Sequence, residues 1–191
     1  MSLQNNKYKI YHIKCNHENI CVKSWKTDRK RFMFRHILQS WGGQRFRSSI
    51  EKNWRANEGN ATLESFDVER PCDIEARYID WMNHTEYYIE LKDYVLVHAG
   101  LNFNIENPFK DTLSRLSVRD FNVNRNRIGN KRVIHGHTSA DISCIMQYIQ
   151  SDAYDSLSLD NGVYMKNRDG YGNFLAYNID TKELIIQPNI D

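Results

Sequence analysis

An apolar stretch at residues 94–101 constrains the fold of this chain more than any other feature. Its letters, YVLVHAGL, run from a tyrosine through three aliphatic residues and then stop at His98 and a glycine. This pattern is typical of a buried strand that ends at the edge of a sheet. Residues 132–138, RVIHGHT, repeat the design and end in His137. Two such strands side by side would hold two imidazoles over one point.

A third stretch near the start of the sequence follows the same pattern. Residues 7–14 alternate enough to predict a strand, and Cys-Asn-His-Glu at residues 15–18 then predicts a strand-to-helix turn. Turns of this kind carry functional side chains in α/β proteins, because a rigid strand fixes the first residue that follows it. Asn16 and His17 are therefore candidate site residues.

Length and composition favour one globular domain over residues 1–191. The chain is 40% hydrophobic and 12% aromatic, which is enough to bury a core. Its 26 basic and 24 acidic residues give a net charge of +2, so no overall field favours nucleic acid or an anionic membrane. We expect neither of these as a partner.

The cysteines and the hydropathy pattern bear on the compartment. The four cysteines contain no Cys-x-x-Cys pair and no zinc-ribbon spacing, which argues against a structural zinc site and fits reduced thiols. No apolar run approaches the ~20 residues of a membrane helix, and the polar N-terminus does not look like a signal peptide. The sequence therefore predicts a cytoplasmic location.

The rest of the sequence predicts helices and strands in mixed order. Helices are expected at residues 18–41, where Gly42 and Gly43 would end the helix, from about 61, and at 73–82, 111–121 and 141–150. Strands are expected at residues 86–90, 157–160, 173–179 and 183–187. The strand at 86–90 should pair with the strand at 94–101 as a hairpin, and the last two strands with each other. The polar stretch at 44–60 indicates a surface excursion or a loose helix.

Asn16, His98 and His137 are plausible ligands of one metal ion. An amide oxygen and two imidazole nitrogens suit Mn, Fe or Zn better than Ca or Mg. A single histidine at such a position is more often hydrogen-bonded in a core or at the surface than bound to metal. Three strand ends with the same pattern favour the metal site.

The same residues carry a resemblance to a known family. Four motifs follow one another in the order found in the metal-dependent Ser/Thr protein phosphatases: Asn-His-Glu at residues 16–18, Val-His-Ala-Gly-Leu at 97–101, Gly-His-Thr at 136–138 and Leu-Asp-Asn-Gly at 159–162. The chain most resembles bacterial and phage-type calcineurin-like metallophosphoesterases, over residues 10–188. The resemblance implies an α/β (α+β) fold, a metallophosphoesterase-type β-sandwich flanked by helices. The strands at 157–187 would form its second sheet.

The resemblance also implies a role for each site residue. It makes Asn16, His98 and His137 ligands of one metal, His17 the catalytic histidine and Arg119 the arginine that holds phosphoryl oxygens. The implied activity is hydrolysis of phosphate monoesters, on a phosphorylated protein or a small phosphoester. A metal-bound water with its pKa lowered towards ~7 would attack, a histidine would protonate the leaving alkoxide, and a guanidinium fork would hold two oxygens. Manganese is the expected metal, with iron or zinc as alternatives.

Two motifs of the family are missing from this sequence. Members carry Gly-Asp-x-His-Gly and Gly-Asp-x-x-Asp-Arg-Gly upstream of the Asn-His-Glu turn, and the chain contains neither. We therefore expect an N-terminally truncated fold without its first βαβα portion. Such a chain would bind at most one metal, where full-length relatives bind two, and would hydrolyse esters poorly or not at all. An uncovered apolar sheet edge would favour self-association.

Three functions stay open at this point. The first is a metal-dependent phosphoesterase similar to the Ser/Thr protein phosphatases. The second is a truncated, catalytically inactive phosphatase fragment that acts at most as a binding module. The third is a dinucleoside polyphosphate hydrolase on the same fold. The first two differ in whether bridging carboxylates complete a two-metal site.

Overall fold

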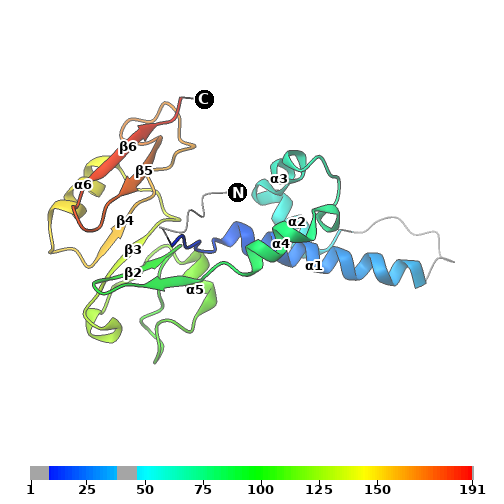
Figure 1. The fold of residues 1–191 in the computed structure, drawn as a ribbon, viewed down its shortest axis with the longest axis horizontal. Coiled ribbons are helices and arrows are strands. Elements are labelled where there is room, and N and C mark those ends of the chain that lie inside the picture. Colours follow the sequence, from blue (N-terminus) through cyan, green and yellow to red (C-terminus); the bar gives the residue numbers. More distant parts are fainter. Residues whose placement is uncertain (1–8, 38–46, 191) are drawn as a thin grey trace. The chain divides into compact units, whose positions relative to one another are not determined.

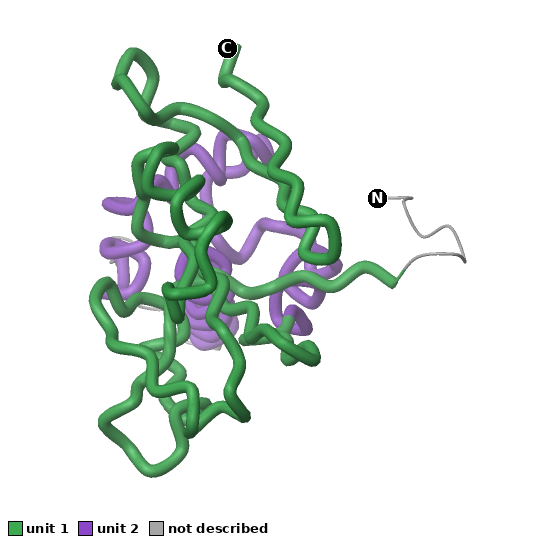
Figure 2. Tube along the Cα trace, turned by 90° about the vertical axis from the view of Figure 1, so that its left-hand side faces the viewer, with its two compact units in different colours: residues 1–15, 86–191 green, residues 16–85 purple. Residues whose placement is uncertain are grey.

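The computed structural model describes residues 9–37 and 47–190 (Figure 1). These residues form a mixed α/β structure with helices and two small sheets. The chain divides into two compact units, which Figure 2 shows in different colours: unit 1 contains residues 1–15 and 86–191, and unit 2 contains residues 16–85. The organisation of residues 1–191 as a single domain stays a prediction. None of the described helices is both long and apolar enough to cross a membrane.

Unit 2 is built from helices. They are α1 (Asn16–Ile37), α2 (Ser49–Trp54), a kinked turn (Arg55–Gly59), α3 (Asn60–Ser65), a short 3-10 turn (Pro71–Asp73) and α4 (Ala76–Asn83). The helix predicted at residues 18–41 is confirmed over residues 18–37 and begins two residues earlier than predicted, at Asn16, whereas its expected end at Gly42 and Gly43 lies outside the described residues. The polar stretch 44–60 contains a helix and a kink where it is described, in agreement with a loose helix.

The core of unit 2 forms around Trp54. Its indole is almost fully buried among Cys21, Leu63 and Ile79. The chain passes so close to this ring that a Cβ atom at Gly59 would lie 2.7 Å from it, so the kink after α2 needs a glycine there.

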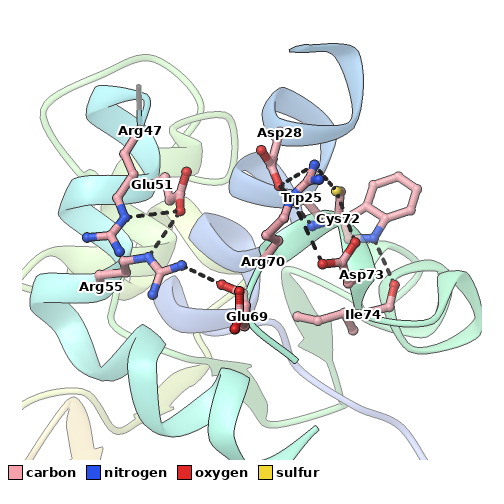
Figure 3. A network of polar contacts seen from close by, with 10 residues as sticks. All are labelled: Trp25, Asp28, Arg47, Glu51, Arg55, Glu69, Arg70, Cys72, Asp73 and Ile74. Carbon is pink, nitrogen blue, oxygen red and sulfur yellow. Dashed lines mark hydrogen bonds and ion pairs between the residues drawn. The ribbon is translucent and has the colours of Figure 1, made fainter. Parts of the chain in front are cut away.

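Charged side chains of unit 2 form the polar network shown in Figure 3. The buried carboxylate of Glu51 accepts a hydrogen bond of 3.0 Å from Nε of Arg55. Asp28 lies 3.4 Å from Nε of Arg70, and Trp25 donates its indole N–H to the carbonyl of Ile74 at 2.9 Å. The first contact joins α2 to the turn that follows it, and the other two hold α1 against the segment that follows α3. The buried carboxylates of Glu51 and Asp28 are therefore paired.

The larger sheet of unit 1 has four strands in the order β1-β2-β3-β4 (Figure 1). Their bounds are β1 Tyr88–Glu90, β2 Tyr94–Val97, β3 Arg132–His135 and β4 Ser156–Ser158. The predicted hairpin is confirmed, since β1 pairs antiparallel with β2. Strands β2, β3 and β4 are parallel to one another, so the residues that follow them meet at one edge of the sheet. This arrangement brings the two predicted strand ends side by side.

The smaller sheet is the hairpin of β5 (Asn173–Tyr177) and β6 (Leu184–Pro188). The pairing of the last two predicted strands is confirmed. The prediction that all strands of residues 157–187 form the second sheet is wrong for β4, which pairs with β3 in the first sheet. The physical reason is the helix α6 (Ile142–Gln150), which returns the chain parallel to β3 as a βαβ crossover does.

Two other predicted elements are shorter than expected. Residues 9–14 form one isolated bridge, between Ile13 and Glu86, instead of a strand, and residues 7–8 lie outside the described part. The helix expected at 111–121 is α5 (Thr112–Ser117). It stops because Val118 adopts an extended backbone, with φ −66° and ψ 137°.

Apolar side chains cover both faces of the four-stranded sheet. Val95, Val97 and Val133 belong to a cluster on one face. Ile134 and Leu157 belong to a second cluster on the other face, with α6 and residues of the β5–β6 hairpin. Since side chains alternate along a strand, this explains why the predicted strands read as continuous apolar runs.

Candidate metal site at the strand ends

His98 and His137 face each other at the ends of β2 and β3. Nε2 of His98 lies 3.2 Å from Nδ1 of His137, and the ring planes make an angle of 65°. The backbone holds the two strand ends together, because the Gly136 N–H donates to the His98 carbonyl at 2.8 Å. The structure therefore brings together the two imidazoles that the sequence placed at neighbouring strand ends.

His137 has an unusual backbone conformation. Its φ is +65°, in the left-handed region that few residues other than glycine adopt. The Thr138 N–H donates to the Gly136 carbonyl at 2.7 Å, so His137 is the central residue of a tight three-residue turn. Backbone strain of this kind is concentrated at functional sites, where the surrounding structure maintains it.

The loop after β4 supports the loop that carries His137. Oδ1 of Asp160 accepts hydrogen bonds from the Ser139 hydroxyl at 3.1 Å and from the Gly162 N–H at 2.8 Å. The Ala140 N–H donates to the Asp160 carbonyl at 2.8 Å. Asp160 thus fixes the turn that orients an imidazole, which gives the Leu-Asp-Asn-Gly motif a structural role.

Asn161, the next residue, connects this support to the hairpin. Its side chain is almost fully buried, and Nδ2 donates to the carbonyls of Ala140 and Gly170 at 3.0 Å and 2.8 Å. Its Oδ1 accepts from the Asn173 N–H at the start of β5 at 3.0 Å. One buried amide therefore fixes the His137 loop to β5.

A third imidazole near the pair was missed by the sequence reasoning. His135 ends β3, and its ring packs edge-on against Phe121 with the centroids 5.2 Å apart. Burial lowers the pKa of His135 below its ordinary value, so the neutral ring is favoured. The signal was present in the sequence, because His135 and His137 are two positions apart at a strand end.

Arg119 is exposed and lies in the segment after α5, which packs next to the end of β2. Val118 and Phe121, on either side of it, occupy the space where a Cβ of Gly100 would lie, at 2.7 Å and 2.5 Å. Gly100 comes two residues after His98, so this contact brings Arg119 to the edge of the sheet at which the imidazoles lie. The role of Arg119 in holding phosphoryl oxygens stays a prediction.

Asn16 and His17 begin α1, in the first turn of unit 2. The predicted change from an extended segment to a helix occurs at this point in the chain. Whether Asn16 joins His98 and His137 as a metal ligand, and whether His17 acts with them, stay predictions.

An apolar cavity of about 470 Å³ lies beside the imidazole pair, within unit 1. Its polar lining residues are His98, His135, His137, Asp160, Asn161 and Asn173. Most of its remaining lining is aliphatic or aromatic and comes from the ends of the parallel strands and from β5: Leu96, Ile134, Leu159, Val163, Phe174, Leu175 and Tyr177. The cavity has the size and composition of many ligand pockets.

The imidazole pair fits the first two ligands of a transition metal. Two nitrogens bound at ~2.0–2.1 Å and separated by ~90–110° around one metal lie roughly 2.9–3.4 Å apart. The observed separation of 3.2 Å falls in this range. Within residues 9–37 and 47–190, however, no three His, Cys, Asp or Glu side chains are grouped so that they could hold a metal ion. The pair alone could therefore supply only part of a coordination sphere.

Comparison with known proteins found no matching family model, and no match among curated proteins or solved structures.

Proposed function

We propose that this chain is a metal-dependent phosphoesterase, similar in its site to the Ser/Thr protein phosphatases, in which His98 and His137 bind one divalent metal ion. The observation that carries the proposal is the 3.2 Å separation of their ring nitrogens at the ends of two parallel strands. The left-handed backbone of His137 and the loop that braces it support a built site.

The proposed fold is a metallophosphoesterase-type β-sandwich flanked by helices. Support comes from the packing between the two sheets of unit 1. Leu175 and Leu184 of the hairpin pack against the cluster of Ile134, Ile145 and Leu157, so both sheets contribute to one apolar layer. Such packing is the basis of a sandwich.

The proposed substrate is a phosphate monoester, on a phosphorylated protein or a small molecule. His98 and His137, with Asn16, would hold manganese, iron or zinc, which when bound lowers the pKa of a water towards ~7 and so provides a nucleophile near neutral pH. His17 would donate a proton to the leaving alkoxide. Arg119 would bind two phosphoryl oxygens through its planar guanidinium.

One observation favours a second candidate, a metal-binding module without catalysis. Efficient phosphoester hydrolysis in two-metal sites needs both the attacking and the leaving oxygen to be stabilised. The described residues offer no group of three or more His, Cys, Asp and Glu for a metal, so bridging carboxylates are not provided there. The two candidates share the metal site and differ in turnover.

Metal titration tests the shared step. Calorimetry with Mn²⁺ should give one site per chain, and His98→Ala or His137→Ala should weaken binding by about tenfold or more, because even loss of a supporting residue around a metal costs 10- to 100-fold. His84→Ala is the matched control, since His84 is exposed at the end of α4 and its Nδ1 contacts the Asp80 carbonyl at 2.6 Å. Equal binding by all four proteins would overturn the proposal.

Turnover then separates the two candidates. With p-nitrophenyl phosphate and Mn²⁺ we expect slow hydrolysis that disappears in His98→Ala. Metal binding without any hydrolysis would support the binding module. Fast turnover, or two metal ions per chain, would show that the site is more complete than proposed.

A further inference from the structure

The outer edge of β5 carries backbone groups that its partner strand does not use. The Asn178 N–H donates to the Glu183 carbonyl at 2.8 Å, and the Asn189 N–H donates to the Gly172 carbonyl at 3.0 Å. Along an antiparallel hairpin, hydrogen-bonded pairs of residues alternate with pairs that are not hydrogen-bonded. In this register Leu175 and Tyr177 belong to pairs that are not hydrogen-bonded, so their N–H and C=O groups point away from β6.

These groups make no other backbone hydrogen bond to any of the residues that the structure describes. The third outward residue, Asn173, is different, because its N–H donates to Oδ1 of Asn161. Two open positions, Leu175 and Tyr177, thus remain on this edge of a hairpin that has only two strands. A two-stranded sheet is only marginally stable by itself.

The apolar cavity lies along this same edge. Its lining includes Phe174, on one face of β5, and Leu175 and Tyr177, on the other face. A cavity that touches both faces of a strand borders its edge. Leu96 and Ile134 of the larger sheet line it as well.

The volume of the cavity fits a short piece of one strand. A strand residue rises ~3.3 Å, stands ~4.8 Å from the next strand and belongs to a layer ~10 Å thick, so it fills roughly 160 Å³. A cavity of about 470 Å³ therefore has room for about three residues. Three residues also match the open part of the edge, from Leu175 to Tyr177.

We infer that β5 binds an extended segment of another polypeptide, which adds a third strand to the hairpin and places apolar side chains, at alternate positions, in the cavity. Backbone hydrogen bonds to Leu175 and Tyr177 give this segment its register, and the apolar lining selects its side chains. The inference does not depend on the proposed metal or phosphoesterase function, because it rests on the backbone groups of Leu175 and Tyr177 and on the apolar part of the cavity lining, although His98 and His137 also line the cavity.

A single extended segment suits the site better than a second copy of this chain. The strands of the described residues all belong to sheets, so a copy would present an edge strand with its neighbour attached. Two adjacent strands need about twice the room of one. Only one fits the cavity.

Selection from a displayed library of random nine-residue peptides tests the inference. We expect the enriched peptides to have apolar residues at every second position, which is the period of a strand. Peptides with helical spacing, with no shared pattern, or no enrichment at all would overturn it.

Two matched variants test the location. Phe174 and Ile185 lie on the same face of the hairpin and are 64% and 60% exposed, but only Phe174 lines the cavity. Phe174→Glu should weaken binding of the enriched peptide at least tenfold, because it places a charge in an apolar site. Ile185→Glu should change it less than twofold. Equal effects of both variants would contradict the proposed edge.

Amide exchange measured by NMR tests the hydrogen bonds themselves. The amides of Leu175 and Tyr177 should exchange fast in the free protein and slowly with the peptide bound, whereas that of Ala176, which pairs with Ile185, should be slow in both. Unchanged exchange at Leu175 and Tyr177 would exclude strand addition. A dimer in sedimentation without peptide, dissociated by Phe174→Glu, would instead assign the edge to a second copy and overturn the inference.

Discussion

At the scale of single residues, His137 combines a predicted ligand with a conformation that the sequence does not show. Its side chain meets His98, and its φ of +65° is forced by the tight turn between Gly136 and Thr138. A left-handed backbone costs an ordinary residue ~1–2 kcal/mol. A histidine in this conformation is therefore consistent with the proposed role of its side chain as a metal ligand.

Two substitutions at this residue separate strain from ligation. His137→Gly removes the strain but adds the ~0.5–1 kcal/mol entropy cost of glycine, so it should be more stable than His137→Ala by roughly 0.5–1 kcal/mol. Both should lose metal affinity to the same extent. Urea unfolding and Mn²⁺ calorimetry measure the two effects. An alanine variant as stable as the glycine variant would mean that the turn relaxes around residue 137.

At the scale of elements, the caps of the two helices beside the sheet are set by aspartates. Asp111 Oδ1 accepts the Leu113 N–H at 3.0 Å at the start of α5, and Asp141 Oδ1 accepts the Ser143 N–H at 2.8 Å at the start of α6. α5 leads to the segment that carries Arg119, so its start influences where that arginine lies.

The cap of α5 gives a pH-dependent prediction. Hydrogen bonds from Asn102, Ser114 and the helix backbone lower the pKa of Asp111. Its contribution is therefore complete above the unfolded pKa of ~3.9 and is lost as the pH falls through the lower folded value. Asp111→Ala should cost about 1 kcal/mol at pH 7, and the difference from the unchanged protein should shrink below pH ~4.

Asp111→Asn is the control for this effect, because it keeps an acceptor oxygen and loses the charge. It should cost less at pH 7. Urea unfolding between pH 3 and pH 7 measures both variants. A cost of Asp111→Ala that stays constant down to pH 3 would show that the charge of Asp111 does not contribute.

At the scale of the whole molecule, each unit has apolar clusters of its own. Trp54 is at the centre of the cluster in unit 2, and Ile145 is fully buried in one of the clusters of unit 1. Trp54→Ala should cost ~3–5 kcal/mol and Ile145→Ala ~2–5 kcal/mol, through lost transfer energy and the cavity left behind. We expect each substitution to lower hydrogen-exchange protection mainly in its own unit.

Native-state exchange read at α1 and at β3 measures this prediction. Trp54→Ala should speed exchange in α1 more than in β3, and Ile145→Ala should do the reverse. Equal loss at both elements in both variants would show one cooperative domain over residues 1–191, which is the organisation that length and composition predict.

The sequence by itself was sufficient where a signal is local. Apolar runs located β2 and β3, because both strands are buried and read as continuous apolar stretches. The histidines His98 and His137, predicted at the ends of these runs, lie next to each other in the candidate site. The first helix, expected from residue 18, and the hairpin of β5 and β6 were also predicted.

Only the tertiary structure decided the features that depend on contacts distant in sequence. The crossover through α6 placed β4 beside β3, the Asp160 loop held His137 in a left-handed turn, and the Gly100 contact anchored the segment of Arg119. The open edge of β5 and the cavity beside it cannot be predicted from the sequence either, because the tertiary arrangement of the other strands determines whether a strand pairs with that edge. Local patterns specify which residues form strands, and the packing of the sheet determines which strand ends meet.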